Sequence, residues 1–175
     1  MPGTEVVIHT REQEDTPRLT LRDARDDDAE GVIALIGAVF AEYPGVILDV
    51  DGEAPELRHI ASWAREQGGA FWVAEREGRI VGTCGVTRLA PGAFELRKLY
   101  VDREERQRGL AGRLVALVET FASDHGGRSL ELWSDVKFET AHAFYERRGF
   151  VRGGTRRLDD KSDTVEHHFR KELDK

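Results

Sequence analysis

The sequence predicts an α/β domain of the α+β kind, in which a mixed, mostly antiparallel sheet of six to seven strands is flanked by four helices. Strand and helix patterns alternate along the chain, and hairpin patterns lie on either side of one strand–helix–strand unit over residues 94–133. Such a unit implies one right-handed parallel crossover. With 175 residues the chain can bury one sizeable core. We therefore expect a loosely ordered leader over residues 1–18 and a single domain over residues 19–175.

The first half of the domain contains one strand pattern and two helix patterns. Residues 19–22 alternate in polarity and predict a strand. Asp26 is placed to cap the helix that follows. Apolar residues recur there at helical spacing: Val32, Leu35, Ile36, Val39 and Phe40. Residues 43–54 predict a loop, and Pro55 suits the first turn of a second helix that Gly68 and Gly69 end.

The second half alternates strands with two further helices. Residues 70–75 and 79–88 predict a hairpin around Arg76-Glu77-Gly78, and a third strand covers residues 94–101. The longest helix pattern runs from Leu110 to Phe121. The remaining patterns predict a strand at 129–133, a helix from about Glu139 to Gly149, and strands at 150–157 and 164–170.

Composition excludes several classes of protein. The 26 Lys and Arg against 33 Asp and Glu give a net charge of −7, which disfavours general capture of nucleic acid or of an anionic membrane. No apolar run approaches the roughly 20 residues of a membrane span. We expect a cytoplasmic protein that binds neither nucleic acid nor a membrane.

The potential metal ligands do not form a recognisable metal motif. The lone cysteine, Cys84, excludes an internal disulfide and a cysteine-rich zinc site, and its place within a strand predicts a buried small residue. His142, His167 and His168 show no metal spacing with a third ligand, so we expect surface residues and no metal.

Residues 101–114 form a turn from a strand into the longest helix, and they combine glycine with arginine. Unpaired N–H groups and the helix dipole make such a start an anion site. Gly109, Ala111 and Gly112 keep the backbone accessible to a phosphate. The alternative is a solvated arginine face. The position of the cluster in an acidic chain favours the anion site, whose cations are Arg103, Arg106, Arg108 and Arg113.

Three segments resemble the GNAT superfamily of N-acetyltransferases. Arg106-Gln107-Arg108-Gly109-Leu110-Ala111 resembles its Arg/Gln-x-x-Gly-x-Gly/Ala signature. Residues 96–101, Leu-Arg-Lys-Leu-Tyr-Val, are similar to its fourth strand, and residues 141–150 to its late Ala-x-x-Phe-Tyr-x-x-x-Gly-Phe segment. The segments occur in the family's order, and the resemblance extends over residues 19–170.

The resemblance implies acetyl-CoA as co-substrate. The backbone of residues 107–112 would hold the pyrophosphate, and the main chain of Leu99 and Val101 would pair with the pantetheine arm. That arm would enter where the fourth strand parts from the strand at 129–133. Phe138 departs from the family, because many members carry a cofactor-contacting Asn there. The full expected set is Leu99, Tyr100, Val101, Arg106, Gln107, Arg108, Gly109, Leu110, Ala111, Gly112 and Arg113.

Two residues are candidates for proton transfer. The resemblance makes Tyr145 the general acid that protonates the thiolate, and the alternative is a core aromatic. Glu95 lies 14 residues before Gly109, as the base does in the histone-acetylating branch. It could instead be a cross-strand partner for Arg97, Arg88 or a charge on a neighbouring strand. Many members of the family use ordered water and backbone carbonyls in place of one dedicated base. We find no covalent acyl-enzyme constellation, which favours direct transfer in a ternary complex.

The acceptor side is less specific. Glu42 and Tyr43 lie in a loop that resembles the family's acceptor loop, while Trp133 and Asp135 follow the fifth strand; Asp135 could equally cap the next helix. We expect a small-molecule or peptide amine as acceptor. The alternatives are a protein N-terminus, a catalytically silent acyl-CoA-binding module, and nucleic-acid binding through the arginines. A homodimer is common in the family.

Overall fold

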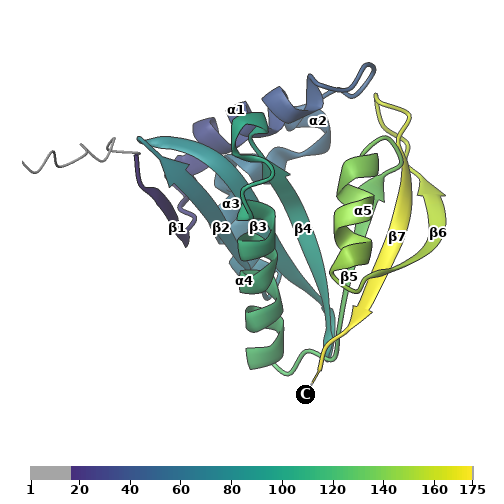
Figure 1. The fold of residues 1–175 in the computed structure, drawn as a ribbon. Helices are drawn as coiled ribbons and strands as arrows, with labels where there is room; N and C mark the ends of the chain where they lie inside the picture. Colours follow the sequence, from purple (N-terminus) through teal and green to yellow (C-terminus); the bar gives the residue numbers. More distant parts are fainter. Residues whose placement is uncertain (1–16, 175) are drawn as a thin grey trace, which may run out of the picture.

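The computed structural model describes residues 17–174, which form one seven-stranded sheet covered by helices on both faces (Figure 1). The strand order is β1-β2-β3-β4-β5-β7-β6, and β4 and β5 form the one parallel pair. The predicted mixed, mostly antiparallel sheet with a single parallel crossover is confirmed. The predicted leader lies outside the described residues except for Pro17 and Arg18.

The elements follow the predicted order with shifts of a few residues. The strands are β1 (Leu19–Asp23), β2 (Ala70–Arg76), β3 (Arg79–Ala90), β4 (Ala93–Val101), β5 (Ser129–Asp135), β6 (Val151–Arg157) and β7 (Val165–Glu172). The α-helices are α1 (Ala29–Phe40), α2 (Val50–Glu53), α3 (Ile60–Glu66), α4 (Leu110–Asp124) and α5 (Glu139–Arg147). Single 3-10 turns are η1 (Asp26–Asp28), η2 (Pro55–His59) and η3 (Arg103–Glu105). None of the helices in this part of the chain is long and apolar enough to cross a membrane.

Two local expectations were wrong. Asp26 does not cap the helix that follows it; its carboxylate accepts the backbone N–H of Ser62 at 2.9 Å and so caps α3. The expected loop over residues 43–54 contains the short helix α2, whose first turn is closed when Asp49 accepts the N–H of Gly52 at 3.1 Å. In both places a side-chain oxygen satisfies backbone donors that apolar periodicity does not reveal.

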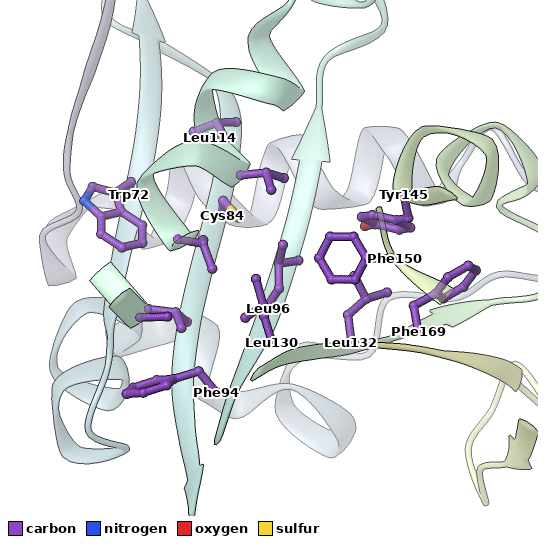
Figure 2. Close-up of a cluster of buried hydrophobic side chains, with 14 of the residues drawn as sticks. Trp72, Cys84, Phe94, Leu96, Leu114, Leu130, Leu132, Tyr145, Phe150 and Phe169 are labelled. Atoms are coloured by element: carbon purple, nitrogen blue, oxygen red, sulfur yellow. The ribbon is translucent and has the colours of Figure 1, made fainter. Parts of the chain in front are cut away.

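Two hydrophobic cores lie on opposite faces of the sheet. One packs α4 and α5 against the sheet, and the other packs α1 and α3 against the opposite face. Gly82 of β3 permits the close approach of α4, because a Cβ there would lie 3.2 Å from methyl carbons of Leu110 and Leu114. Figure 2 shows the first core, in which Cys84 is buried as predicted.

The sheet parts between β4 and β5. Only three residue pairs join these strands: Ala93 with Ser129, Phe94 with Leu130, and Glu95 with Glu131. Beyond them the two strands diverge, as Figure 1 shows. The parting that the family resemblance implied is therefore present.

A bulge in β4 accompanies the parting. Thr83 of β3 pairs with Tyr100, and Gly85 pairs with Arg97, so that Lys98 and Leu99 lie opposite the single residue Cys84. Lys98 has a φ of 52°, which is uncommon for a residue other than glycine. A bulge of this kind bends its strand and redirects side chains.

The core between α4 and the sheet should respond strongly to truncation at Leu114, which is fully buried. We expect Leu114→Ala to lower the free energy of unfolding by about 2–5 kcal/mol. The matched control Leu89→Ala, at a side chain that is 47% exposed, should change it by less than about 0.5 kcal/mol. Urea denaturation followed by circular dichroism measures both, and equal losses would contradict the packing described.

Candidate active site

The turn from β4 into α4 presents a row of backbone donors. The N–H groups of residues 107–112 have no hydrogen-bond acceptor within residues 17–174, and the α4 ladder begins when the N–H of Arg113 donates to the Gly109 carbonyl at 3.1 Å. Gln107 and Gly109 have φ values of 63° and 82°, and a Cβ on Gly109 would meet nothing within 4 Å. The turn is therefore open, and its unpaired amides at a helix N-terminus suit an anion.

The arginines of this turn have different roles. Arg106 is held by Glu42 through two hydrogen bonds of 2.7 and 2.6 Å, and its Nε donates to the Val101 carbonyl at 3.1 Å. The other three guanidinium groups are exposed and have no ion pair within the described part of the chain: Arg103, Arg108 and Arg113. Leu110 directs its side chain into the core, which leaves only its backbone to the turn.

A chamber of about 540 Å³ lies where β4 and β5 part. Of the predicted acceptor residues, Trp133 and Asp135 line it. Glu42 and Tyr43 do not: Glu42 binds Arg106, and the Tyr43 ring packs 4.7 Å from that of Phe138. The strand and helix residues in the lining are Ile36, Phe40, Gly52, Glu53, Leu57, Leu96, Lys98, Leu99, Tyr100, Leu132, Trp133, Ser134, Asp135, Tyr145 and Glu166.

Tyr145 contributes the hydroxyl of a buried side chain to this chamber. Its ring packs against Phe150 and Phe169 at centroid distances of 5.8 and 5.5 Å, and the residue is 5% exposed. Figure 2 shows the hydroxyl oxygen on the side of the ring that faces β4. No hydrogen-bond partner for it occurs among the described residues. Burial raises the pKa of this phenol, so that it stays protonated at neutral pH.

Tyr100 approaches the chamber from the opposite face of the sheet. Its side chain belongs to the core with α1, where it meets the Phe40 ring edge-on at 5.6 Å. Burial raises the pKa of this phenol too. Any contact with a cofactor on the α4 side would therefore use the main chain of Tyr100 rather than its ring.

Glu95 lies just outside the chamber lining, at the last pair that joins β4 to β5. Its carboxylate is 3.9 Å from the Arg97 guanidinium, which is the ion-pair alternative that the sequence left open. The side chain is 14% exposed, and burial raises the pKa of its carboxyl group. The position of Glu95 does not bring it among the residues that line the chamber.

The expectation that His142 is a surface residue is wrong, because this residue is 2% exposed. Its Nε2 lies 2.9 Å from the Asp135 carbonyl and 3.2 Å from the Ser134 hydroxyl, and burial lowers the pKa of the ring. It thereby fixes the end of β5 beside the chamber. His142 precedes Tyr145 by one helical turn, a spacing that could have revealed its inward position. His167 and His168 are half-buried.

Asp135 closes a local turn and also lines the chamber. Its Oδ1 accepts the backbone N–H of Lys137 at 2.9 Å, and its own carbonyl accepts the N–H of Phe138 at 3.0 Å. The alternative that Asp135 caps the next helix was wrong, because its carboxylate closes the turn before α5 and the N-cap of α5, Phe138, has no side-chain capping bond. Within residues 17–174 no group of three or more His, Cys, Asp or Glu side chains could hold a metal ion.

A buried ion pair at the β4 bulge was not foreseen. Lys98 Nζ lies 2.8 Å from Glu56 Oε1, and each side chain is 16% exposed. Lys98 is the one cationic side chain in the chamber lining of the described chain, whereas the lining carboxylates are Asp49, Glu53, Asp135, Asp159, Asp160 and Glu166.

Two loops that are distant in sequence join beside the chamber. Ser162 Oγ accepts the N–H of Ile47 at 2.8 Å, and the N–H of Lys161 donates to Glu53 at 2.7 Å. Lys161 Nζ also pairs with Asp49 at 2.7 Å. We call these contacts the loop clasp. It joins the segment between α1 and α2 to the turn between β6 and β7, which meet at the top of Figure 1.

Known proteins resemble this chain in sequence and in fold. Residues 38–150 match the model of the acetyltransferase (GNAT) family. N-acetyltransferase 8 of Homo sapiens is 36% identical over 98 residues, which cover 53% of this chain and 43% of that protein. The N-acetyltransferase YjgM of Escherichia coli (strain K12) is 32% identical over 141 residues, which cover 76% of this chain and 79% of that protein.

Solved structures share the fold at lower identity. A GNAT-family acetyltransferase of Staphylococcus aureus Mu50 superposes with a TM-score of 0.79 at 23% identity, covering 90% of this chain and 100% of that chain. The acetyltransferase yncA of Salmonella typhimurium, solved with its cofactor acetyl-CoA, has a TM-score of 0.69 at 14% identity and covers 90% and 95%. Because the family match covers more than half of the sequence and the Escherichia coli relative aligns with three quarters of it, this chain belongs to the GNAT family of acetyltransferases.

Proposed function

We propose that this protein transfers the acetyl group of acetyl-CoA directly to the amino group of a small acceptor, with both substrates bound together. Two observations carry the proposal: the open row of amides at the turn between β4 and α4, and the Tyr145 hydroxyl in the chamber where β4 and β5 part. When bound, acetyl-CoA supplies an activated thioester.

The turn before α4 suits the diphosphate of the cofactor. Donors in residues 107–112 have no acceptor in the described part of the chain, and the left-handed conformation at Gly109 leaves open space beside them. Three exposed arginines surround the turn and would add attraction for the phosphates. The Val101 carbonyl accepts a hydrogen bond from Arg106, and the main chain of Leu99 would pair with the pantetheine arm.

Two protons must move during the transfer. The acceptor nitrogen forms a bond to the acetyl carbon and loses a proton, while the carbon–sulfur bond breaks and the sulfur gains one. Burial keeps the Tyr145 hydroxyl protonated, so that it can donate a hydrogen bond to the sulfur as negative charge develops there. Glu95 is outside the lining, so it would act on the acceptor only through water. We propose that a water molecule in the chamber accepts the proton that the acceptor nitrogen loses.

The surroundings of the chamber favour a small, positively charged amine. Carboxylates dominate the polar lining, and they attract an ammonium group before it is deprotonated. The loop clasp closes one wall through contacts between segments more than 100 residues apart. That wall favours a compact acceptor over an extended protein N-terminus.

Tyr145→Phe is the most direct test of the chemistry. We expect kcat to fall by about 100-fold or more while the CoA affinity stays unchanged, because only the donated proton is lost. Thiol release over a panel of amines and calorimetric titration with CoA measure the two quantities. Undiminished turnover would contradict the role of Tyr145. A wild-type protein that binds CoA but acetylates no amine would support a catalytically silent acyl-CoA-binding module.

Gly109→Ala tests the amide turn. An alanine at φ 82° is strained by about 1–2 kcal/mol, so the turn should relax and displace its N–H groups. We expect the CoA dissociation constant to rise about tenfold or less, in keeping with that strain. The matched control Gly154→Ala, where an added Cβ also meets nothing within 4 Å, should leave it unchanged. Equal affinities in the two variants would argue against phosphate binding at this turn.

The loop clasp should govern the mobility of the segment between α1 and α2. The double variant Lys161→Ala/Ser162→Ala removes the Asp49 pair and the Ile47 hydrogen bond, so amide hydrogen exchange in residues 46–54 should become a few-fold faster. Arg157→Ala, which breaks an ion pair with Asp163 within the same hairpin, is the control. Unchanged exchange in the double variant would show that the clasp does not hold the segment.

A further inference from the structure

Lys98 occupies an unusual position for a lysine. It stands in the β4 bulge with a φ of 52°, and Thr83 Oγ1 donates a hydrogen bond of 2.8 Å to its carbonyl. A left-handed conformation is strained for a residue with a side chain, and it persists only where the surroundings hold it. Here the result is an ammonium group that lines the chamber from the strand on which the acetyl group would lie.

The ammonium group has spare hydrogen-bonding capacity. It carries three N–H donors, and its one ion-pair partner in the described chain is Glu56 at 2.8 Å. Burial lowers the pKa of Lys98, whereas the Glu56 carboxylate favours its charged form. A group that is 16% exposed gains little from bulk water, so a ligand acceptor in the chamber would satisfy the remaining donors.

The charges around the chamber select between kinds of acceptor. An acceptor with only negative groups would be repelled by the lining carboxylates, and an acceptor with only positive groups would leave Lys98 facing like charge. Some of these carboxylates already have partners, since Asp49 pairs with Lys161 and Glu166 pairs with Arg156. Asp159 is an exposed lining carboxylate for which no partner occurs among residues 17–174.

We propose that the acceptor carries a carboxylate as well as its amine, as amino acids do, and that Lys98 binds that carboxylate and thereby sets acceptor specificity. The inference rests on the proposed acetyl transfer and narrows its substrate class. Lys98 acts here as a positioning residue. The Glu56 carboxylate orients the ammonium group and leaves its other donors to the acceptor.

The competing explanation is structural: the ion pair would only fasten η2 to β4. The double variant Lys98→Gln/Glu56→Gln separates the two, because it removes both charges and keeps amide groups of similar shape that can bond to each other. A purely structural pair predicts a lower melting temperature with unchanged substrate preference. The proposal predicts a change in preference at a temperature where the variant is folded.

The experiment compares amino acids with their carboxamides as acceptors in a thiol-release assay. In the wild type we expect kcat/KM to favour the carboxylate by roughly tenfold or more, as for a hydrogen bond to a charged group. In the double variant that ratio should approach one through a higher KM for the carboxylate, with kcat nearly kept. Lys98→Arg should keep part of the wild-type preference for the carboxylate over the carboxamide. Arg97→Gln is the matched control: Arg97 neighbours Lys98 but lies over the Trp63 ring outside the lining, so the ratio should persist.

The possible outcomes test acetyl transfer and the preference for a carboxylate-bearing acceptor separately. A wild type that acetylates diamines and carboxamides as readily as carboxylate-bearing amines would overturn the inference and leave acetyl transfer standing. So would a double variant that keeps the wild-type ratio, or one that loses kcat equally with both acceptors. If no amine of any class is acetylated, the proposed function itself fails, and the inference fails with it.

Discussion

The parting of β4 from β5 is the constraint on which the rest of the site depends. Three residue pairs hold the strands together, and the bulge at Lys98 and Leu99 then bends β4 away. A continuous sheet would have buried the edges of both strands in a hydrogen-bonded ladder. The parted sheet instead leaves main-chain groups of β4 free and opens a chamber that side chains reach from both faces.

The turn before α4 and the chamber differ in their chemistry. On the face with α4 and α5, open amides and exposed arginines suit phosphates, and Tyr145 stands in an aromatic cluster. In the chamber, the charged lining consists of carboxylates and of Lys98. An acidic chain thus has one cationic turn, which we propose binds the donor, and a mostly anionic chamber, which we propose binds the acceptor.

Local sequence patterns were sufficient for the sheet and for the turn before α4. Apolar periodicity defined the helices, and glycine beside arginine at a strand end indicated an anion site. Contacts between distant segments were beyond those patterns. The Lys98–Glu56 pair joins residues 42 positions apart, and the clasp from Ile47 to Ser162 spans 115. Asp26 likewise caps a helix far along the chain, which no local rule links to it.

The central claim is that the parted strands bring the amide turn and the Tyr145 hydroxyl to one bound cofactor. A crystal structure of the protein with acetyl-CoA tests this most directly. The account predicts diphosphate oxygens within about 3.2 Å of N–H groups in residues 107–112, with the thioester sulfur between β4 and β5 in reach of the Tyr145 hydroxyl. Acetyl-CoA bound elsewhere, or with its sulfur remote from Tyr145, would contradict it.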